Sequence, residues 1–305
     1  MRILENLNID FMSKRKLFYI VSLVIIGAGI VSVAVRGVAL GLDFKGGTEV
    51  VVRLPHAMEL TELRALMDDA NLGSFVIKSF GTDTDYIIRT EQKGEGASIS
   101  DGIKDYLASH VDGELEILQE NRVEAKIGNE IRRDAIIAIF FALLGILAYI
   151  SFRFKVIFAA GAVAALFHDV LIAFGLVSIF NGILPGLNLE FDQAMVAAFL
   201  TIVGYSINDT VVVFDRIREN LKISKTGVFG EILNKSINDT LSRTVLTSST
   251  TMVAMLALLL FGGEPTRGFA FALCIGVITG TYSSIFVASA LTQDWVIARK
   301  AKITF

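Results

Sequence analysis

The apolar residues of the chain gather in six long runs, which shorter polar segments separate. A helix needs about 20 mostly apolar residues to cross the hydrocarbon core of a bilayer, and all six runs meet or approach that length. The pattern therefore predicts an α-helical polytopic membrane protein. The six predicted spans are Leu17–Val35, Ala135–Phe152, Val156–Phe180, Ala194–Phe214, Val245–Phe261 and Phe269–Leu291.

The stretch between the first two spans is more polar and alternates between strand-like and helix-like spacing. Its order, β-α-β-β-α-β, is that of the ferredoxin-like split unit, so we expect a small α+β domain there. The predicted elements are Thr48–Arg53, Glu59–Asn71, Phe75–Phe80, Asp85–Thr90, Ile99–His110 and Glu114–Ala125, with a turn at 81–84.

Lysine and arginine are distributed unevenly among the segments that join the spans. If both termini are cytoplasmic, the cytoplasmic segments hold fifteen of these residues and the two short outer loops hold one, Arg267. Because such residues stay on the cytoplasmic side, we expect cytoplasmic termini and an external α+β domain. That domain is acidic, since residues 37–130 contain 18 acidic and 9 basic side chains.

These predictions divide the chain into three parts. Residues 1–36 form a cytoplasmic N-terminus and the first span, and residues 37–132 form the external domain. Residues 133–305 form a five-helix bundle with a cytoplasmic loop at 215–243. Within that loop, Phe229–Leu241 has apolar residues at helical spacing, which predicts an interfacial helix or a docking site for a cytoplasmic partner.

Composition and motifs argue against several kinds of chemistry. Hydrophobic residues make up 53% of the chain, the formal charge is −3, and no basic stripe of the kind that binds nucleic acid occurs. Gly41–Thr48 (GLDFKGGT) nearly matches a phosphate-binding loop, but Gly47 replaces the lysine that reaches the phosphates. His56, His110 and His168 lack the spacing of zinc ligands. We therefore expect no cofactor, no metal and no bond-making catalysis.

Asp209 in the fourth span and Arg243 at the start of the fifth are the strongest functional candidates. Asp209 lies roughly 7–8 Å inside the membrane boundary, and ionisable residues there mark ion pathways or interior pairs. A carboxylate balanced between desolvation and a nearby guanidinium can bind and release a proton. The two residues therefore form either a proton relay or a static ion pair that joins helices. Polar residues share their helix faces: Thr201, Tyr205 and Asn208 with Asp209, and Thr247, Thr250 and Thr251 with Arg243.

His168 and Asp169 lie in the middle of the third span, where an ionisable side chain is still more costly. Either they extend a proton path or they bond across helices, and the sequence leaves both open. Tyr205, Asn208 and Thr247 have the same two possible roles.

Three long motifs resemble those of the SecD/SecF protein-export family. Gly41–Thr48, which follows the first span, resembles the family's signature. Val203–Leu221 (VGYSINDTVVVFDRIRENL) is similar to a fourth-span motif of the family, and Ser236–Thr251 (SINDTLSRTVLTSSTT) to a fifth-span motif. The residues that carry the signature here are Gly41, Asp43, Phe44, Gly46 and Gly47.

The resemblance implies a fold of the resistance-nodulation-division type, in which the chain and SecD form a pseudo-twofold pair of six-helix bundles. It also implies a location in the bacterial plasma (inner) membrane and association with the SecY-SecE-SecG channel, and with YajC and YidC. The chain would contact lipid and unfolded preprotein, and it would use the proton-motive force at a late stage of export. Asp209 and Arg243 match the carboxylate and the arginine that the family links to proton movement.

Two other functions stay open. A small-molecule exporter of the same superfamily is expected to have two large outer domains in a much longer chain, whereas one such domain is predicted here. A passive subunit that only holds SecD and the channel together would use the same charged residues as a structural ion pair.

Overall fold

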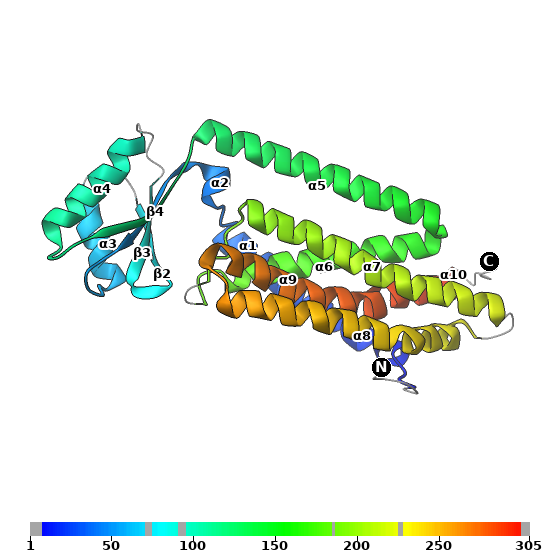
Figure 1. Ribbon diagram of the computed structural model, residues 1–305. Coiled ribbons are helices and arrows are strands. Elements are labelled where there is room, and N and C mark those ends of the chain that lie inside the picture. Colours follow the sequence, from blue (N-terminus) through cyan, green and yellow to red (C-terminus); the bar gives the residue numbers. More distant parts are fainter. Residues whose placement is uncertain (1–7, 71–74, 91–95, 185–186, 225–227, 300–305) are drawn as a thin grey trace. The chain divides into compact units, whose positions relative to one another are not determined.

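The computed structural model describes residues 8–70, 75–90, 96–184, 187–224 and 228–299, and Figure 1 shows its helices and strands. The chain divides into two compact units. The helical unit comprises residues 1–38, 139–183 and 194–305, and the sheet unit comprises residues 39–138 and 184–193. The short segment 184–193 joins two spans, and nothing in the hydrophobic pattern predicted that it belongs with the sheet.

In the described part of the chain, six helices are long and apolar enough to cross a membrane, and each contains one predicted span. The predicted fold class is therefore confirmed. The sixth span has three consecutive parts, of which the middle one, η2, is a π-helical turn. The helices are α1 (Arg15–Arg36, after the 3-10 turn η1, Met12–Lys14), α5 (Ala125–Arg153), α6 (Val156–Phe180), α7 (Gln193–Ile223), α8 (Phe229–Phe261), and α9 (Glu264–Ser283) with η2 (Ser284–Ser289) and α10 (Ala290–Arg299).

The prediction of an interfacial helix at Phe229–Leu241 is wrong. Helix α7 continues to Ile223, and Phe229–Leu241 is the first part of α8, continuous with the fifth span. The apolar face of this segment is buried inside the helical unit, with Leu233 and Ile237 at its centre. Amphipathic spacing shows that a helix has an apolar face, but it does not show whether lipid or protein covers that face.

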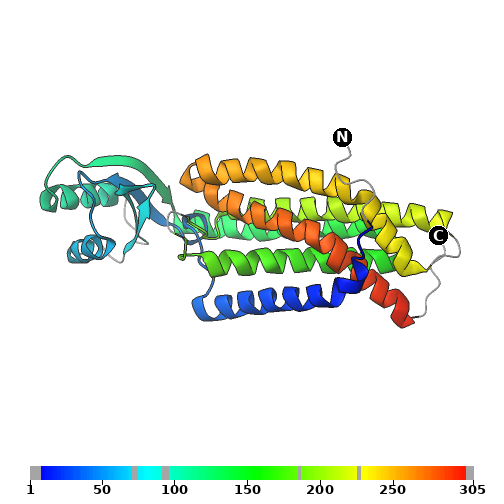
Figure 2. The same ribbon diagram turned by 90° about the horizontal axis from the view of Figure 1, so that it is seen from below.

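Helices α1 and α6 run side by side in the helical unit, as Figure 2 shows. Two glycines permit this close approach: a Cβ atom added to Gly29 would lie 2.5 Å from the Cα atom of Gly175. Small residues at such crossings let membrane helices gain packing contacts that lipid tails cannot offer. The α1–α6 contact therefore depends on the absence of side chains at these two positions.

The sheet unit has the predicted β-α-β-β-α-β order. Its sheet has the strand order β2-β3-β1-β4, with every pair antiparallel, which is the ferredoxin-like arrangement. Helices α3 and α4 pack their apolar faces on one face of the sheet (Figure 1) and close a core around Val50, Val52 and Ile88. The elements are α2 (Leu42–Lys45), β1 (Gly47–Arg53), α3 (Leu60–Asp69), β2 (Phe75–Phe80), β3 (Thr82–Thr90), α4 (Gly96–His110) and β4 (Glu116–Val123).

The hairpin between β2 and β3 is tighter than the predicted turn at 81–84. Strand β3 already begins at Thr82, and Gly81 alone separates it from β2. Gly81 has a φ of +67°, a conformation that glycine adopts at little cost.

Candidate functional site

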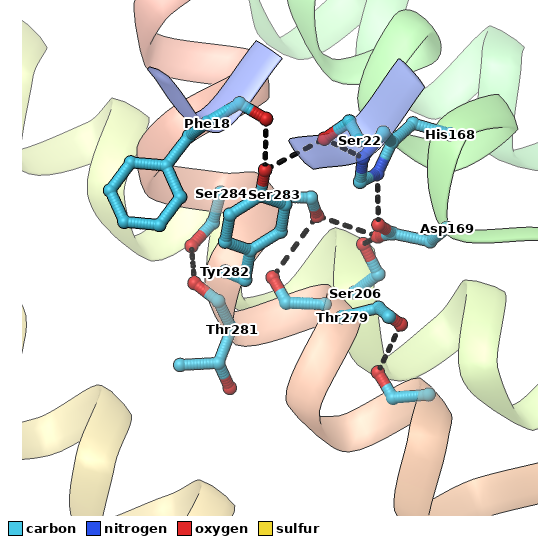
Figure 3. Close-up of polar contacts among 12 residues, drawn as sticks. Phe18, Ser22, His168, Asp169, Ser206, Thr279, Thr281, Tyr282, Ser283 and Ser284 are labelled. Carbon is cyan, nitrogen blue, oxygen red and sulfur yellow. Dashed lines mark hydrogen bonds and ion pairs between the residues drawn. The ribbon is translucent and has the colours of Figure 1, made fainter. Parts of the chain in front are cut away.

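The middle of the helical unit contains a buried polar cluster, shown in Figure 3. At its centre, His168 and Asp169 of α6 have side chains that are 8% and 0% exposed. Nδ1 of His168 lies 2.9 Å from Oδ1 of Asp169. Because ionisable groups are costly in the interior of a membrane protein, the contacts of this pair bear directly on its role.

Hydroxyl groups from two other helices surround Asp169. Ser206 of α7 donates a short hydrogen bond to Oδ2, and Ser283 of α9 donates another to the same oxygen at 2.6 Å. Both serines are fully buried. Among the described residues, no lysine or arginine forms an ion pair with Asp169, so only His168 or a bound proton can balance its charge.

The other ring nitrogen of His168 faces α1. Nε2 lies 2.8 Å from Oγ of Ser22, which lies 2.7 Å from the hydroxyl of Tyr282 on α9. Tyr282 in turn donates to the backbone carbonyl oxygen of Phe18, at 2.7 Å. An unbroken series of short polar contacts therefore joins α6 to α1 and α9, as the dashed lines in Figure 3 show.

Close helix packing places these hydroxyl groups. A Cβ atom added to Gly280 of α9 would lie 3.2 Å from the Cα atom of Ser206, and one added to Gly276 would lie 2.2 Å from the side chain of Ile202. The small residues of α9 thus let α7 approach and bring Ser206 next to Ser283. The π-helical turn η2 starts directly after Ser283, and such turns often occur at functional sites.

Asp209 is buried in the same unit and lies at the end of a second series of hydroxyl groups. Tyr205 of α7 donates to Ser248 of α8 at 3.3 Å, and Ser248 lies 2.6 Å from the hydroxyl of Thr281 on α9. Thr281 donates to Oδ2 of Asp209 at 3.5 Å, which is the outer limit of a hydrogen bond. Asp209 is therefore held far less tightly than Asp169.

The structure does not bring Arg243 into an ion pair with Asp209. Within the described residues no such pair is formed, and the Arg243 side chain is exposed on α8, although still within electrostatic range of Asp209. Asn208 is also exposed. Of the residues predicted to act beside Asp209, only Tyr205 shares its hydroxyl series. The other predicted hydroxyl groups bond to carbonyl oxygens of their own helices: Thr201, Thr247, Thr250 and Thr251.

The glycine-rich motif of the sheet unit forms a junction with the segment before α7. The N–H of Gly41 donates to the carbonyl oxygen of Phe191, and the N–H of Phe191 donates to that of Ala39, both at 2.7 Å. Oδ2 of Asp43 accepts the N–H of Gln193, the first residue of α7, at 3.1 Å. A carboxylate at this position satisfies a free N–H group of the first helical turn and interacts favourably with the helix dipole.

The rest of the motif fixes the path of the chain at this junction. Phe44 is buried, and Gly46 and Gly47 have φ values of +75° and +131°. A Cβ atom on Gly128, in the first turn of α5, would lie 3.2 Å from the N atom of Gly46. The motif therefore needs glycine for its turns and for contact with α5.

A cluster of four charged side chains holds segment 187–193 on the sheet. Arg89 forms ion pairs with both Glu49 and Glu190, and Nζ of Lys78 lies 2.6 Å from Oε1 of Glu190. Burial would raise the pKa of the Glu190 carboxyl, but Arg89 and Lys78 outweigh it and hold that pKa below its ordinary value. The cluster thus contains two positive and two negative side chains, and it binds β2 and β3 to the segment that leads into α7.

Sequence reasoning missed most partners of the buried acids. Serine and tyrosine are common in membrane helices, so one sequence does not show that Ser22, Ser206, Ser283 and Tyr282 face one point. Glu190 lies in a short segment that the hydrophobic pattern indicates only as a connection between two spans. In the described ranges, no group of three or more histidine, cysteine or acidic side chains could hold a metal ion.

Two family models match this chain. The model "Protein export membrane protein SecD/SecF, C-terminal" matches residues 103–298, and the SecD/SecF GG motif model matches residues 31–54, which include the Gly41–Thr48 junction. The chain belongs to the SecD/SecF protein-export family. It is 46% identical to the protein translocase subunit SecF of Rhodothermus marinus, over 96% of this chain and 95% of that protein. It is 40% identical to the same subunit of Calditerrivibrio nitroreducens, over 93% of each.

Solved structures of SecDF are similar in fold. The crystal structure of SecDF from Thermus thermophilus, described as a translocon-associated membrane protein, has a TM-score of 0.85 and 35% identity over 97% of this chain. SecDF in a super-membrane-facing form has a TM-score of 0.70 at the same identity and coverage. The chain spans only 39–40% of those longer proteins. As a member of this family with six membrane helices, the chain is a multi-pass subunit of the Sec protein-export machinery.

Proposed function

We propose that this subunit, together with SecD, uses the proton-motive force to assist the late stage of preprotein translocation across the bacterial inner membrane. Both termini are cytoplasmic and the sheet unit is external in this proposal, which the distribution of lysine and arginine supports. The SecY-SecE-SecG channel, YajC and YidC are the further partners, and unfolded preprotein is the substrate. Family membership supports this role.

The observation that carries the proton-driven part is the presence, among the described residues, of two buried carboxylates, Asp169 and Asp209, that form no ion pair with lysine or arginine. An uncompensated charge is costly inside a bilayer, so a proton is the natural counter-charge. One elementary charge that crosses 100 mV supplies ~2.3 kcal/mol, which shifts a two-state equilibrium by roughly 50-fold.

Helix α7 offers a direct route from Asp209 to the sheet unit. It is one continuous helix from Gln193 to Ile223, so Asp209 lies about 24 Å along the axis from Gln193. Asp43 caps that first residue, and Glu190 fastens the preceding segment to the sheet. A shift of α7 on protonation of Asp209 would therefore act on the sheet through the glycine-rich motif.

Conformational change in the family supports this coupling. The two SecDF structures match this chain with equal identity, 35%, but with TM-scores of 0.85 and 0.70. The part of SecDF that corresponds to this chain therefore occurs in two different arrangements. A motor subunit needs two such states, and a gradient of protons can bias one against the other.

The test compares Asp209→Asn with Asp215→Asn in inverted membrane vesicles that carry the assembled complex with SecD. Asp215 lies on the same helix, but its side chain is 37% exposed and paired with Arg153, so it is the matched control. We expect Asp209→Asn to lose stimulation of preprotein translocation by the proton-motive force, and Asp215→Asn to keep it.

ATP-driven insertion and co-purification of SecD should be unchanged in both variants. Full stimulation in Asp209→Asn would contradict the proposal. Loss of SecD from the complex in Asp209→Asn would instead assign the residue to assembly and favour the passive role.

A further inference from the structure

We propose that the His168–Asp169 pair is a second proton-binding site, and that the hydroxyl groups of Ser22 and Tyr282 fix how many protons it holds. The proposal goes beyond the function above. Its test uses the chain alone, without export, so either proposal can fail while the other stands.

On the side of His168 that faces α1, the number of available hydrogen atoms decides whether Nε2 is protonated. Three short contacts follow one another: Nε2 to Ser22, Ser22 to Tyr282, and Tyr282 to the carbonyl oxygen of Phe18. Each contact needs one hydrogen atom between its two heavy atoms. The carbonyl oxygen cannot donate, and each hydroxyl group supplies one hydrogen. Two hydroxyl groups cannot fill three contacts, so the third hydrogen must come from Nε2.

The direction of the series follows from the same count. Tyr282 donates to the carbonyl oxygen, Ser22 donates to Tyr282, and Nε2–H of His168 donates to Ser22. The opposite direction would leave two oxygen atoms 2.7 Å apart, those of Tyr282 and Phe18, with no hydrogen between them. The series therefore locks His168 in a form that is protonated at Nε2.

On the other side of the ring, the contact between Nδ1 and Oδ1 of Asp169 needs one further hydrogen. The serines that bond to Oδ2 supply their own hydrogens, so they do not change this count. The hydrogen comes either from a protonated Asp169 or from a doubly protonated His168. In both cases the pair is neutral overall and carries one proton more than the ionised acid beside a neutral ring.

Release of this proton requires the hydroxyl series to reverse. A neutral ring beside ionised Asp169 keeps its hydrogen on Nδ1, which leaves Nε2 bare. The Ser22 hydroxyl must then turn to donate to Nε2. The Tyr282 hydroxyl must turn away from the carbonyl oxygen of Phe18 and donate to Ser22 instead. Ser22 lies on α1 and Tyr282 on α9. The number of protons on the His168–Asp169 pair of α6 is therefore linked to the contacts between these three helices.

The other titratable groups around the pair are few. Tyr282 approaches it from α9, and Asp209 lies one helical turn after Ser206 on α7. On α1, Tyr19 and Arg15 bond to Asp294 of α10, so they are already paired. No described lysine or arginine neutralises Asp169, which leaves the proton of the pair as the counter-charge.

The test is a nitrogen NMR measurement of His168 in the full chain, with histidine labelled by nitrogen-15, in detergent or bilayers. The His168→Gln variant identifies its signals among those of the three histidines. We expect Nε2 to carry a hydrogen at neutral pH and to lose it only at a higher pH, when the hydroxyl series reverses. A bare Nε2 beside a protonated Nδ1 in the unaltered chain at neutral pH would overturn the proposal.

The Tyr282→Phe variant tests whether the hydroxyl series is what keeps Nε2 of His168 protonated. Without the tyrosine hydroxyl, Ser22 is free to donate to Nε2, so we expect a bare Nε2 to appear at a lower pH than in the unaltered chain. The control is Ser248→Ala, which removes a hydroxyl group of the Asp209 series and should leave His168 unchanged. An unchanged His168 in Tyr282→Phe would show that the hydroxyl series does not set the proton count, and it would also overturn the proposal.

Discussion

The two units of the molecule balance buried negative charge in opposite ways. In the sheet unit, Glu49 and Glu190 both bond to Arg89, and Lys78 adds a further positive charge. In the helical unit, the described contacts of Asp169 and Asp209 are with hydroxyl groups and one histidine. A permanent cation holds a carboxylate in one state, whereas hydroxyl groups and histidine leave room for a proton to come and go.

The charge cluster of the sheet unit holds segment 187–193 in place, whereas the carboxylates of the helical unit can change their protonation state. The charge cluster of the sheet unit is suited to transmit force, because segment 187–193 can leave the sheet only if these ion pairs are broken. The carboxylates of the helical unit are suited to change state, because a proton can replace the missing cation. The helical unit must then gain its rigidity from close packing, such as the contact between Gly29 and Gly175.

The largest effect should follow from removing the permanent cation of the sheet unit. Arg89→Met leaves Glu49 and Glu190 without their shared partner, which should destabilise this unit by about 3–5 kcal/mol. Hydrogen exchange of β1 and β3 in the full chain measures the loss. Arg133→Met is the control, because the side chains of Arg133 and its partner Asp134 are 71% and 64% exposed, and its effect should be much smaller. Equal destabilisation of the sheet unit in both variants would show that Arg89 has no special role in holding segment 187–193 on the sheet.

The next effect should come from disturbing the close packing of the helical unit. Gly29→Ala forces α1 away from the backbone of Gly175 and should cost about 1–3 kcal/mol. Gly27→Ala, on the same helix, meets nothing within 4 Å and should be neutral or slightly stabilising. Thermal unfolding of the purified chain in detergent measures both. A similar melting temperature for the two variants would refute the claim that this contact holds α1 to α6.

A smaller and more local effect should follow at the junction. Asp43→Ala removes the cap from Gln193 and should cost about 0.5–2 kcal/mol. Faster hydrogen exchange in the first turn of α7 would report this loss, while Asp43→Asn, which keeps an accepting oxygen, should show little change. If Asp43→Ala exchanged at the unaltered rate, the cap would not contribute to the junction.

The smallest effect is a dependence of the sheet unit on acidity. The pKa of Glu190 is lowered in the folded chain, so its ionised form stabilises the fold fully above the ordinary value of 4.5. As the pH falls below 4.5 toward the lowered pKa, this stabilisation should decline, and segment 187–193 should exchange faster. Glu190→Gln should remove the pH dependence. Its persistence in that variant would assign it to another group.

The spans and the ferredoxin-like order could be predicted because each depends on local pattern. Runs of about 20 apolar residues and alternation along strands are visible in one sequence. The buried position of Asp209 was also within reach, since an acid inside an apolar run is conspicuous. The prediction of an interfacial helix at Phe229–Leu241 failed because one apolar face looks the same whether protein or lipid covers it.

The partners of the buried acids could not be predicted from the sequence, for a different reason. Ser22 and Tyr282 are 260 positions apart in the chain, and they meet only because the crossings of α1, α6 and α9 have particular angles and depths. The same holds for Glu190, which reaches Arg89 across 101 positions. Such contacts depend on tertiary packing, which no local pattern encodes.

The most direct test of the central claim is an infrared difference spectrum of the subunit, reconstituted with SecD in vesicles, before and after a proton gradient is imposed. If protons balance the buried charges of the helical unit, the stretching band of a protonated carboxyl group should change. That change should vanish in Asp209→Asn, and Glu190→Gln should leave it intact. A spectrum without such a change, or a change that vanishes only in Glu190→Gln, would contradict the account.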